Sequence, residues 1–120
     1  MNVLECKDKD GIDVVCSQET WLIHILDEHP EMNGYEAYVK TAIGDPYQIY
    51  QDSSNLNKRI IYKPFILPKP YNLQYLRVVI EYPRRKFGKA RGFVHTAFPC
   101  LNIKKGDILL WQTQSITPAT

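Results

Sequence analysis

The sequence predicts an α+β fold in which N-terminal helices pack on one face of a twisted antiparallel sheet of four to five strands. Apolar residues recur at helical spacing between residues 18 and 44 and alternate with polar residues from residue 47 onward. The connections between the alternating segments are short, and short connections favour antiparallel neighbours. Helical segments followed by strands are typical of α+β proteins. The length of 120 residues indicates a single domain over residues 1–120.

The first 30 residues predict a hairpin followed by a helix. Residues 2–6 and 12–16 are short apolar segments separated by a turn that contains Asp-Gly, a strong hairpin signal. Ser17 offers a side-chain oxygen to cap a helix over residues 18–28, which Pro30 ends. The expected buried face of this helix consists of Trp21, Leu22, Ile25 and Leu26.

A second helix and five strands account for the rest of the chain. Asn33 with Glu36 three residues later is a capping signature, and Gly44 with Pro46 ends the helix. Its expected apolar face consists of Tyr35, Tyr38, Val39, Ala42 and Ile43. The strands, rich in Ile, Val, Tyr and Phe, cover residues 47–51, 58–63, 75–82, 92–98 and 107–112. With helices on one face only, the other face of the sheet should be partly open.

The charged residues are unevenly distributed. Five of the 15 basic residues lie between residues 83 and 92, where there is no acidic residue, so the remaining ten are outnumbered by 13 acidic ones. Such a focused basic loop attracts phosphate, and it can also be a solvated hairpin loop whose charges prevent aggregation. The candidates for nucleic-acid binding in this loop are Arg84, Arg85, Lys86, Lys89 and Arg91.

Composition and the N-terminus argue for a cytoplasmic protein. Three cysteines without CxxC spacing predict neither a disulfide framework nor a zinc knuckle, which fits a reducing compartment. The N-terminus has no basic segment followed by an apolar one, so export is not indicated. The longest apolar stretches are too short to cross a bilayer, so no membrane partner is expected.

Two histidines of the first helix are candidates for proton transfer. His24 lies at the flank of the apolar face, while His29 lies near its centre at the end of the helix. A histidine at such a boundary can be held by packing and still face a substrate. His29 can instead cap the C-terminus of the helix. The two diverge by about 140° on a helix, unlike a metal-binding His pair, so no metal site is predicted.

Polar residues of the strands supply further candidates. His95 and Thr96 point to opposite faces unless a bulge intervenes, and a threonine is in any case a good strand former. Arg59, Tyr62 and Arg77 alternate with Ile and Val, as expected on a sheet with one polar face that holds a phosphodiester. Histidines, cations and an open sheet suit RNA cleavage by 2′-oxygen attack, which requires no metal or other cofactor.

Several short motifs occur in an order found in one nuclease superfold. They are Trp-x-x-His-Ile from Trp21, His-Pro-Glu-Met from His29, Gly-Asp-Pro-x-x-Ile from Gly44, Arg-x-x-Tyr from Arg59, Tyr-Leu-Arg-Val-Val-Ile from Tyr75 and Val-His-Thr-Ala-Phe from Val94. Over roughly residues 20–111 the chain resembles the barnase/EndoU/colicin/RelE-like nuclease superfold, in particular its small prokaryotic or phage-borne members. The resemblance implies N-terminal helices on a four-stranded antiparallel sheet and metal-independent cleavage of RNA, often tRNA or mRNA. Many members of that superfold act as toxins.

The resemblance also assigns roles to single residues. It makes His24 the leading acid or base, Arg59 and Tyr62 contacts to the phosphate and the transition state, and Thr96 the polar residue of the last motif. His29 and His95 are extra catalytic candidates that it does not demand. The implied partners are RNA and an antitoxin or immunity protein. The sequence leaves open a non-catalytic module that binds RNA or protein on the same fold, and a protein inhibitor or adaptor.

Overall fold

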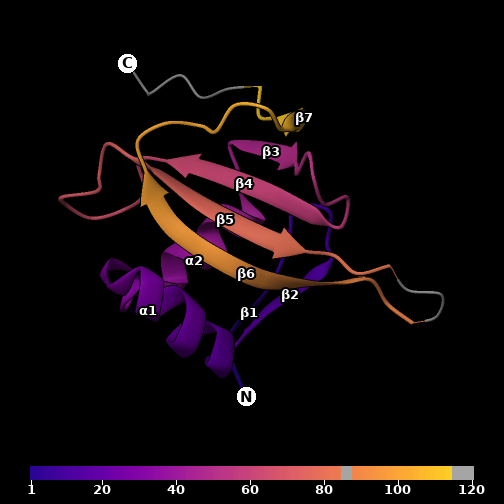
Figure 1. Ribbon diagram of the computed structural model, residues 1–120, viewed down its shortest axis with the longest axis horizontal. Coiled ribbons are helices and arrows are strands. Elements are labelled where there is room, and N and C mark those ends of the chain that lie inside the picture. The colour runs from indigo at the N-terminus through magenta and orange to yellow at the C-terminus, as the bar shows by residue number, and fades with distance from the viewer. Residues whose placement is uncertain (85–87, 115–120) are drawn as a thin grey trace.

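The computed structural model describes residues 1–84 and 88–114 and contains one seven-stranded sheet (Figure 1). The strands are ordered β1-β2-β6-β5-β4-β3-β7 across the sheet. Their bounds are β1 (Asn2–Lys7), β2 (Asp13–Ser17), β3 (Gln48–Gln51), β4 (Lys58–Pro64), β5 (Tyr75–Glu81), β6 (Arg91–Cys100) and β7 (Ile108–Gln112). The helical segments are a π-helix η1 (Thr20–Ile25), α1 (Leu26–Glu28), a 3-10 helix η2 (Pro30–Met32) and α2 (Glu36–Gly44).

The predicted sheet of four to five antiparallel strands is wrong. The sheet is mixed, because β2 pairs in parallel with β6 through Asp13–Arg91, Val14–Gly92 and Val15–Phe93. The N-terminal hairpin β1–β2 thereby joins the sheet instead of standing apart from it. Short connections constrain only strands that are consecutive in the sequence, whereas β2 and β6 are separated by most of the chain. Local spacing therefore could not reveal this pairing.

Strands β3 to β6 form an antiparallel meander that β7 extends at the edge of β3, and one of its register shifts lies next to a predicted site. Strands β3, β4, β5 and β6 pair consecutively, and β7 pairs with the free edge of β3. Between β5 and β6 the register shifts, because Val79 is opposite Thr96 while Ile80 is opposite Val94. His95 is therefore the extra residue of a β-bulge.

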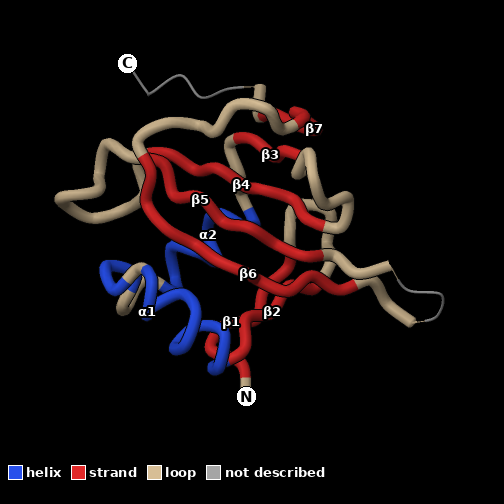
Figure 2. Tube along the Cα trace, in the orientation of Figure 1, coloured by secondary structure: helices blue, strands red, loops and turns tan. Residues whose placement is uncertain are grey.

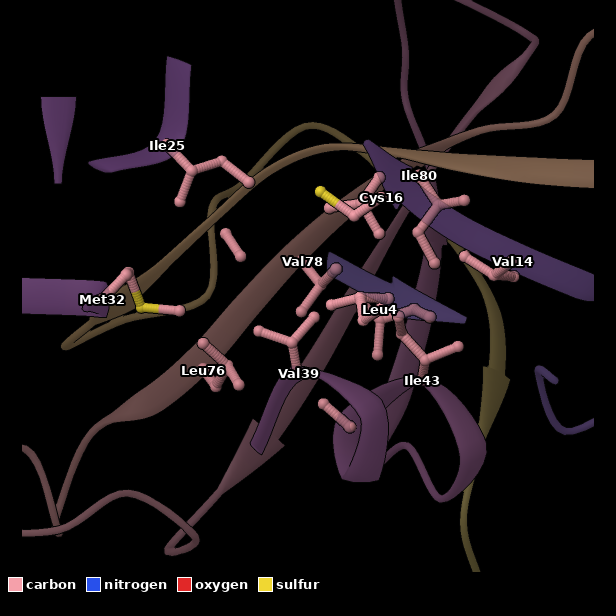
Figure 3. Packing of buried hydrophobic residues seen from close by; sticks show 14 of the residues in the cluster. Leu4, Val14, Cys16, Ile25, Met32, Val39, Ile43, Leu76, Val78 and Ile80 are labelled. Carbon is pink, nitrogen blue, oxygen red and sulfur yellow. The ribbon is translucent and has the colours of Figure 1, made fainter. Parts of the chain in front are cut away.

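The helical segments pack on one face of the sheet, called here the helix face (Figure 2). Figure 3 shows side chains from the helices, the sheet and the N-terminal hairpin in one apolar cluster. Helix α2 contributes Val39 and Ile43, strand β5 contributes Leu76, Val78 and Ile80, and the hairpin contributes Leu4, Val14 and Cys16. The hairpin is thus part of the main core.

The first helix differs from the predicted α-helix. The backbone N–H of Leu26 bonds to the carbonyl of Trp21, the i to i+5 pattern of a π-helix. The prediction that Ser17 caps this segment is confirmed, because its Oγ accepts a hydrogen bond from the Thr20 N–H at 3.0 Å. Trp21 and Ile25 are buried, but Leu22 is 49% exposed. The wider turn changes the angular positions, so the prediction of Leu22 on the buried face is wrong.

The predicted cap of the second helix is also wrong. Asn33 makes no cap for α2, because η2 and a left-handed Gly34 (φ 82°) lie before the helix. The N-cap position is occupied by Tyr35, whose side chain makes no capping bond. Asn33 instead follows η2 and donates its backbone N–H to the carbonyl of Pro30.

The opposite face of the sheet, called here the far face, is partly covered. It holds a small buried cluster of Ile60, Tyr62 and Val79, with Tyr50, Tyr75, Cys100 and Ile103 packed against it. The connection between β6 and β7 crosses this cluster, where the Lys104 N–H donates to the Tyr62 hydroxyl at 3.2 Å. The uncovered part of the far face lies along β5 and β6, next to η1 and α1.

Replacing Trp21 tests the helix-to-sheet contact. Trp21→Ala should lower the free energy of unfolding by about 3–5 kcal/mol, because the side chain is 3% exposed and its removal leaves a cavity. Urea melts give this value directly. The exposed neighbour Leu22→Ala serves as the control, with a much smaller effect. Equal losses for both variants would mean that Trp21 does not anchor the helix.

Candidate active site

The bulge in β6 brings two predicted site residues to one face. In a β-bulge two residues of one strand stand opposite a single residue of its partner, here Val79 on the far face. His95 and Thr96 therefore lie side by side on that face. The sequence predicts them on opposite faces unless a bulge intervenes, and the bulge is present. His95 is exposed and Thr96 is half-buried.

Side chains from the first helix and from the sheet converge on His95. His24 in η1 and Glu28 in α1 are exposed and lie close enough to interact electrostatically with its imidazole. From the sheet, Lys58 and Glu81 do the same, and these two are directly opposite each other on β4 and β5. His24 and His95, about 70 residues apart in the sequence, thus lie within electrostatic range of each other.

The surroundings of His95 favour its neutral form. Partial burial is the largest cause that lowers its pKa from the ordinary value of 6.5, and the positive Lys58 lowers it further. Glu81 and Glu28 oppose this effect, while His24 adds to it. The lowered pKa favours the unprotonated imidazole, the form that accepts a proton.

His29 is anchored next to this cluster by an aromatic stack. Its ring lies on Phe98 with the centroids 4.3 Å apart and the planes 19° from parallel. The guanidinium carbon of Arg77 lies 5.4 Å from the centroid of the same Phe98 ring. The Nδ1 of His29 is 3.7 Å from a carboxylate oxygen of Glu31. This packing fixes the end of α1 against β6, and it leaves His29 less accessible than His24.

Tyr62 positions an arginine rather than facing solvent. The side chain is fully buried, and its hydroxyl accepts hydrogen bonds from Arg77 Nε and from the Lys104 N–H, both at 3.2 Å. Tyr62 and Arg77 are directly opposite each other on β4 and β5. The hydroxyl therefore holds the guanidinium of Arg77 on the far face. A direct contact between Tyr62 and a substrate phosphate does not fit this burial.

Arg59 does not join the site. It lies three residues from Tyr62 on β4, and such residues point to opposite faces of a strand. On the helix face its guanidinium carbon is 5.2 Å from the centroid of the Tyr82 ring. The structure thus separates two residues that the sequence placed at one phosphate.

The basic loop lies at the other end of β6 from Phe98. Among its described residues, Arg84, Lys89 and Arg91 are exposed, and Arg91 begins β6. Arg85 and Lys86, which were also predicted to bind nucleic acid, lie outside the described residues.

Sequence reasoning missed Glu28, Lys58 and Phe98 as parts of this site. A signal for Lys58 exists, because Lys58, Ile60 and Tyr62 alternate along one strand and so share a face. For Phe98 the signal is weaker: it lies two residues after Thr96 and therefore on the same side of β6. The neighbourhood of Glu28 depends on how η1 and α1 lie against β6, which spacing does not fix.

Comparison of the chain with family models, with curated proteins and with solved structures finds no match. Within residues 1–84 and 88–114, no helix is long and apolar enough to span a membrane. In the same described segments, no three His, Cys, Asp or Glu side chains are grouped as metal ligands would be. The assignment of a function therefore depends on the geometry of the site.

The positioning role of Tyr62 can be measured as stability. Tyr62→Phe should lower the free energy of unfolding by about 1–3 kcal/mol, because two donors lose their buried acceptor. Tyr75→Phe is the matched control on the same face, since the Tyr75 hydroxyl has no hydrogen-bond partner among the described residues, and its effect should stay within about 0.5 kcal/mol. Similar urea melts for the two variants would contradict this role.

Proposed function

We propose that this protein is a metal-independent endoribonuclease, toxin-like or phage-associated, that cleaves RNA by attack of a 2′-oxygen on the adjacent phosphorus. The observation that carries the proposal is the convergence of His24 and His95 from a helix and a strand bulge on an accessible part of the far face. Two neighbouring imidazoles can supply the base and the acid that this reaction needs. The substrate itself provides the nucleophile.

On this proposal each residue has a part in the reaction. Neutral His95 takes the proton from the 2′-hydroxyl, and His24 donates a proton to the departing 5′-oxygen. The products are a 2′,3′-cyclic phosphate and a 5′-hydroxyl. Lys58 and Arg77 on the far face would stabilise the negative charge that develops on the phosphorane oxygens, with the Thr96 hydroxyl as an additional donor. Glu28 next to His24 and His95 can hold either imidazole in orientation.

The proposed site lies on the part of the mixed sheet where β3 to β6 pair consecutively and antiparallel. On this proposal the partners are tRNA or mRNA in the cytoplasm and a protein inhibitor of the antitoxin or immunity type.

Replacing the two histidines tests the mechanism. His24→Gln and His95→Gln should each lower the cleavage rate about 10²–10⁴-fold, because each removes one proton-transfer group. Purified protein is incubated with tRNA, mRNA and translating ribosomes in EDTA, and the product ends are analysed for a cyclic phosphate. Lys105→Gln, at an exposed lysine of the β6–β7 connection, is the control and should cleave at the wild-type rate. No cleavage by the wild type would favour the non-catalytic binding module.

The pH dependence tests the role of His95 as the base. Activity requires its neutral form, so kcat/KM should fall as the pH drops through the lowered pKa, with a midpoint below 6.5. Lys58→Gln removes a positive charge that lowers this pKa, and the midpoint should therefore move upward. A midpoint above 6.5 in the wild type, or one that Lys58→Gln leaves unchanged, would assign the base to another group.

A further inference from the structure

Arg59 is a half-buried guanidinium without an acceptor. Among the described residues, none accepts a hydrogen bond from its N–H groups or forms an ion pair with it. Its guanidinium instead makes a cation–π contact with the ring of Tyr82. An arginine has five donors in a rigid planar fork that matches a phosphate or carboxylate. None of its nitrogens is a fully buried atom, so the donors are open to water or to a ligand that carries an oxyanion.

The guanidinium is held in place by a buried network. The Tyr82 hydroxyl donates to Asp8 Oδ2 at 2.9 Å, and Asp8 is 9% exposed. The other carboxylate oxygen of Asp8 accepts the backbone N–H groups of Asp10 and Ile12, both at 2.9 Å. The turn between β1 and β2 thus fixes Tyr82, and Tyr82 fixes the plane against which Arg59 lies. Both carboxylate oxygens of Asp8 are engaged by these bonds.

A second cation, Lys9 from the same turn, lines the same hollow as Arg59. The ammonium of Lys9 lies 4.8 Å from the centroid of the Trp111 ring and 2.9 Å from a carboxylate oxygen of Asp10. The hollow has a volume of about 280 Å³, and it is lined by Lys9, Asp10, Ile49, Arg59, Leu110 and Trp111. Two positive groups against one negative group leave the hollow with a net positive charge. Three apolar side chains provide its remaining walls.

We propose that this hollow binds a small ligand that carries a phosphate or carboxylate on an apolar body. Arg59 would take the oxyanion with two parallel hydrogen bonds and Lys9 would add a charge-assisted bond, while the apolar body packs on Leu110 and Trp111. The volume fits a ligand smaller than a typical cofactor. Because Arg59 lies on the helix face and His95 on the far face, this site is separate from the candidate active site and does not depend on the proposed nuclease activity.

The two tryptophans provide the readout. Phenyl phosphate, benzoate and inorganic phosphate are titrated into the full chain while the indole N–H signals are followed by NMR. Trp111 should shift, and Trp21, buried in the core, should not. Phenyl phosphate or benzoate should bind with a Kd of about 1 mM or tighter, and which of the two binds better identifies the oxyanion. Inorganic phosphate, which lacks the apolar body, should bind more weakly.

Substitutions distinguish specific binding in the hollow from nonspecific binding of anions to a basic protein. Arg59→Gln should weaken binding roughly 10- to 100-fold, and Arg59→Lys should restore only part of it because the bidentate contact is lost. Lys9→Gln, in an exposed turn, should also weaken binding without disturbing the core. Lys105→Gln is the control and should bind like the wild type. A Trp111 that no probe shifts, or binding that survives both Arg59→Gln and Lys9→Gln, would overturn the proposal.

Discussion

The structure depends on the close packing around Gly92, where β6 begins to pair with β2 and β5 at the same time. A Cβ at this position would lie 2.8 Å from the Tyr82 ring, 2.9 Å from Ile80 and 3.1 Å from Val14. Only a glycine permits these three side chains to meet over the strand. The parallel pairing with β2 and the packing of Tyr82 both involve this position. The Tyr82 ring in turn lies against the guanidinium of Arg59 on the helix face.

Strand β6 then changes its neighbours along its length, and the bulge at His95 marks the change. Its first residues pair with β2 on one side and β5 on the other, whereas its later residues pair with β5 and lie against η1 and η2. Where β2 ends, the edge of β6 becomes accessible to the helix that carries His24 and Glu28. The extra residue turns His95 to the far face at this point. The candidate active site is therefore a consequence of a strand longer than the partner beside it.

The sequence was a good guide to elements and a poor one to their assembly. All seven strands lie where alternation and turn residues placed them, because these signals are local. The parallel β2–β6 pair, the π-helical turn that exposes Leu22 and the bulge at His95 all arise from packing between distant segments. Arg59 and Tyr62 show a different limit: the alternation is interpreted as one polar face that holds both residues, although a three-residue spacing on a strand places them on opposite faces. The structure has them on opposite faces.

A tyrosine–arginine pair occurs on both faces of the sheet. On each face a tyrosine orients an arginine: the Tyr62 hydroxyl accepts from Arg77 on the far face, and the Tyr82 ring lies against Arg59 on the helix face. Tyr62 is buried and Tyr82 is held by Asp8, so both tyrosines are fixed before any ligand arrives. A fixed arginine loses less side-chain freedom when it binds an oxyanion, which makes such a pair effective for recognition. Arg59 on β4 and Arg77 on β5 lie on opposite faces of the sheet. Neither arginine can therefore assist the other at one phosphate. The nuclease proposal and the ligand proposal therefore rest on different arginines, and each can fail without the other.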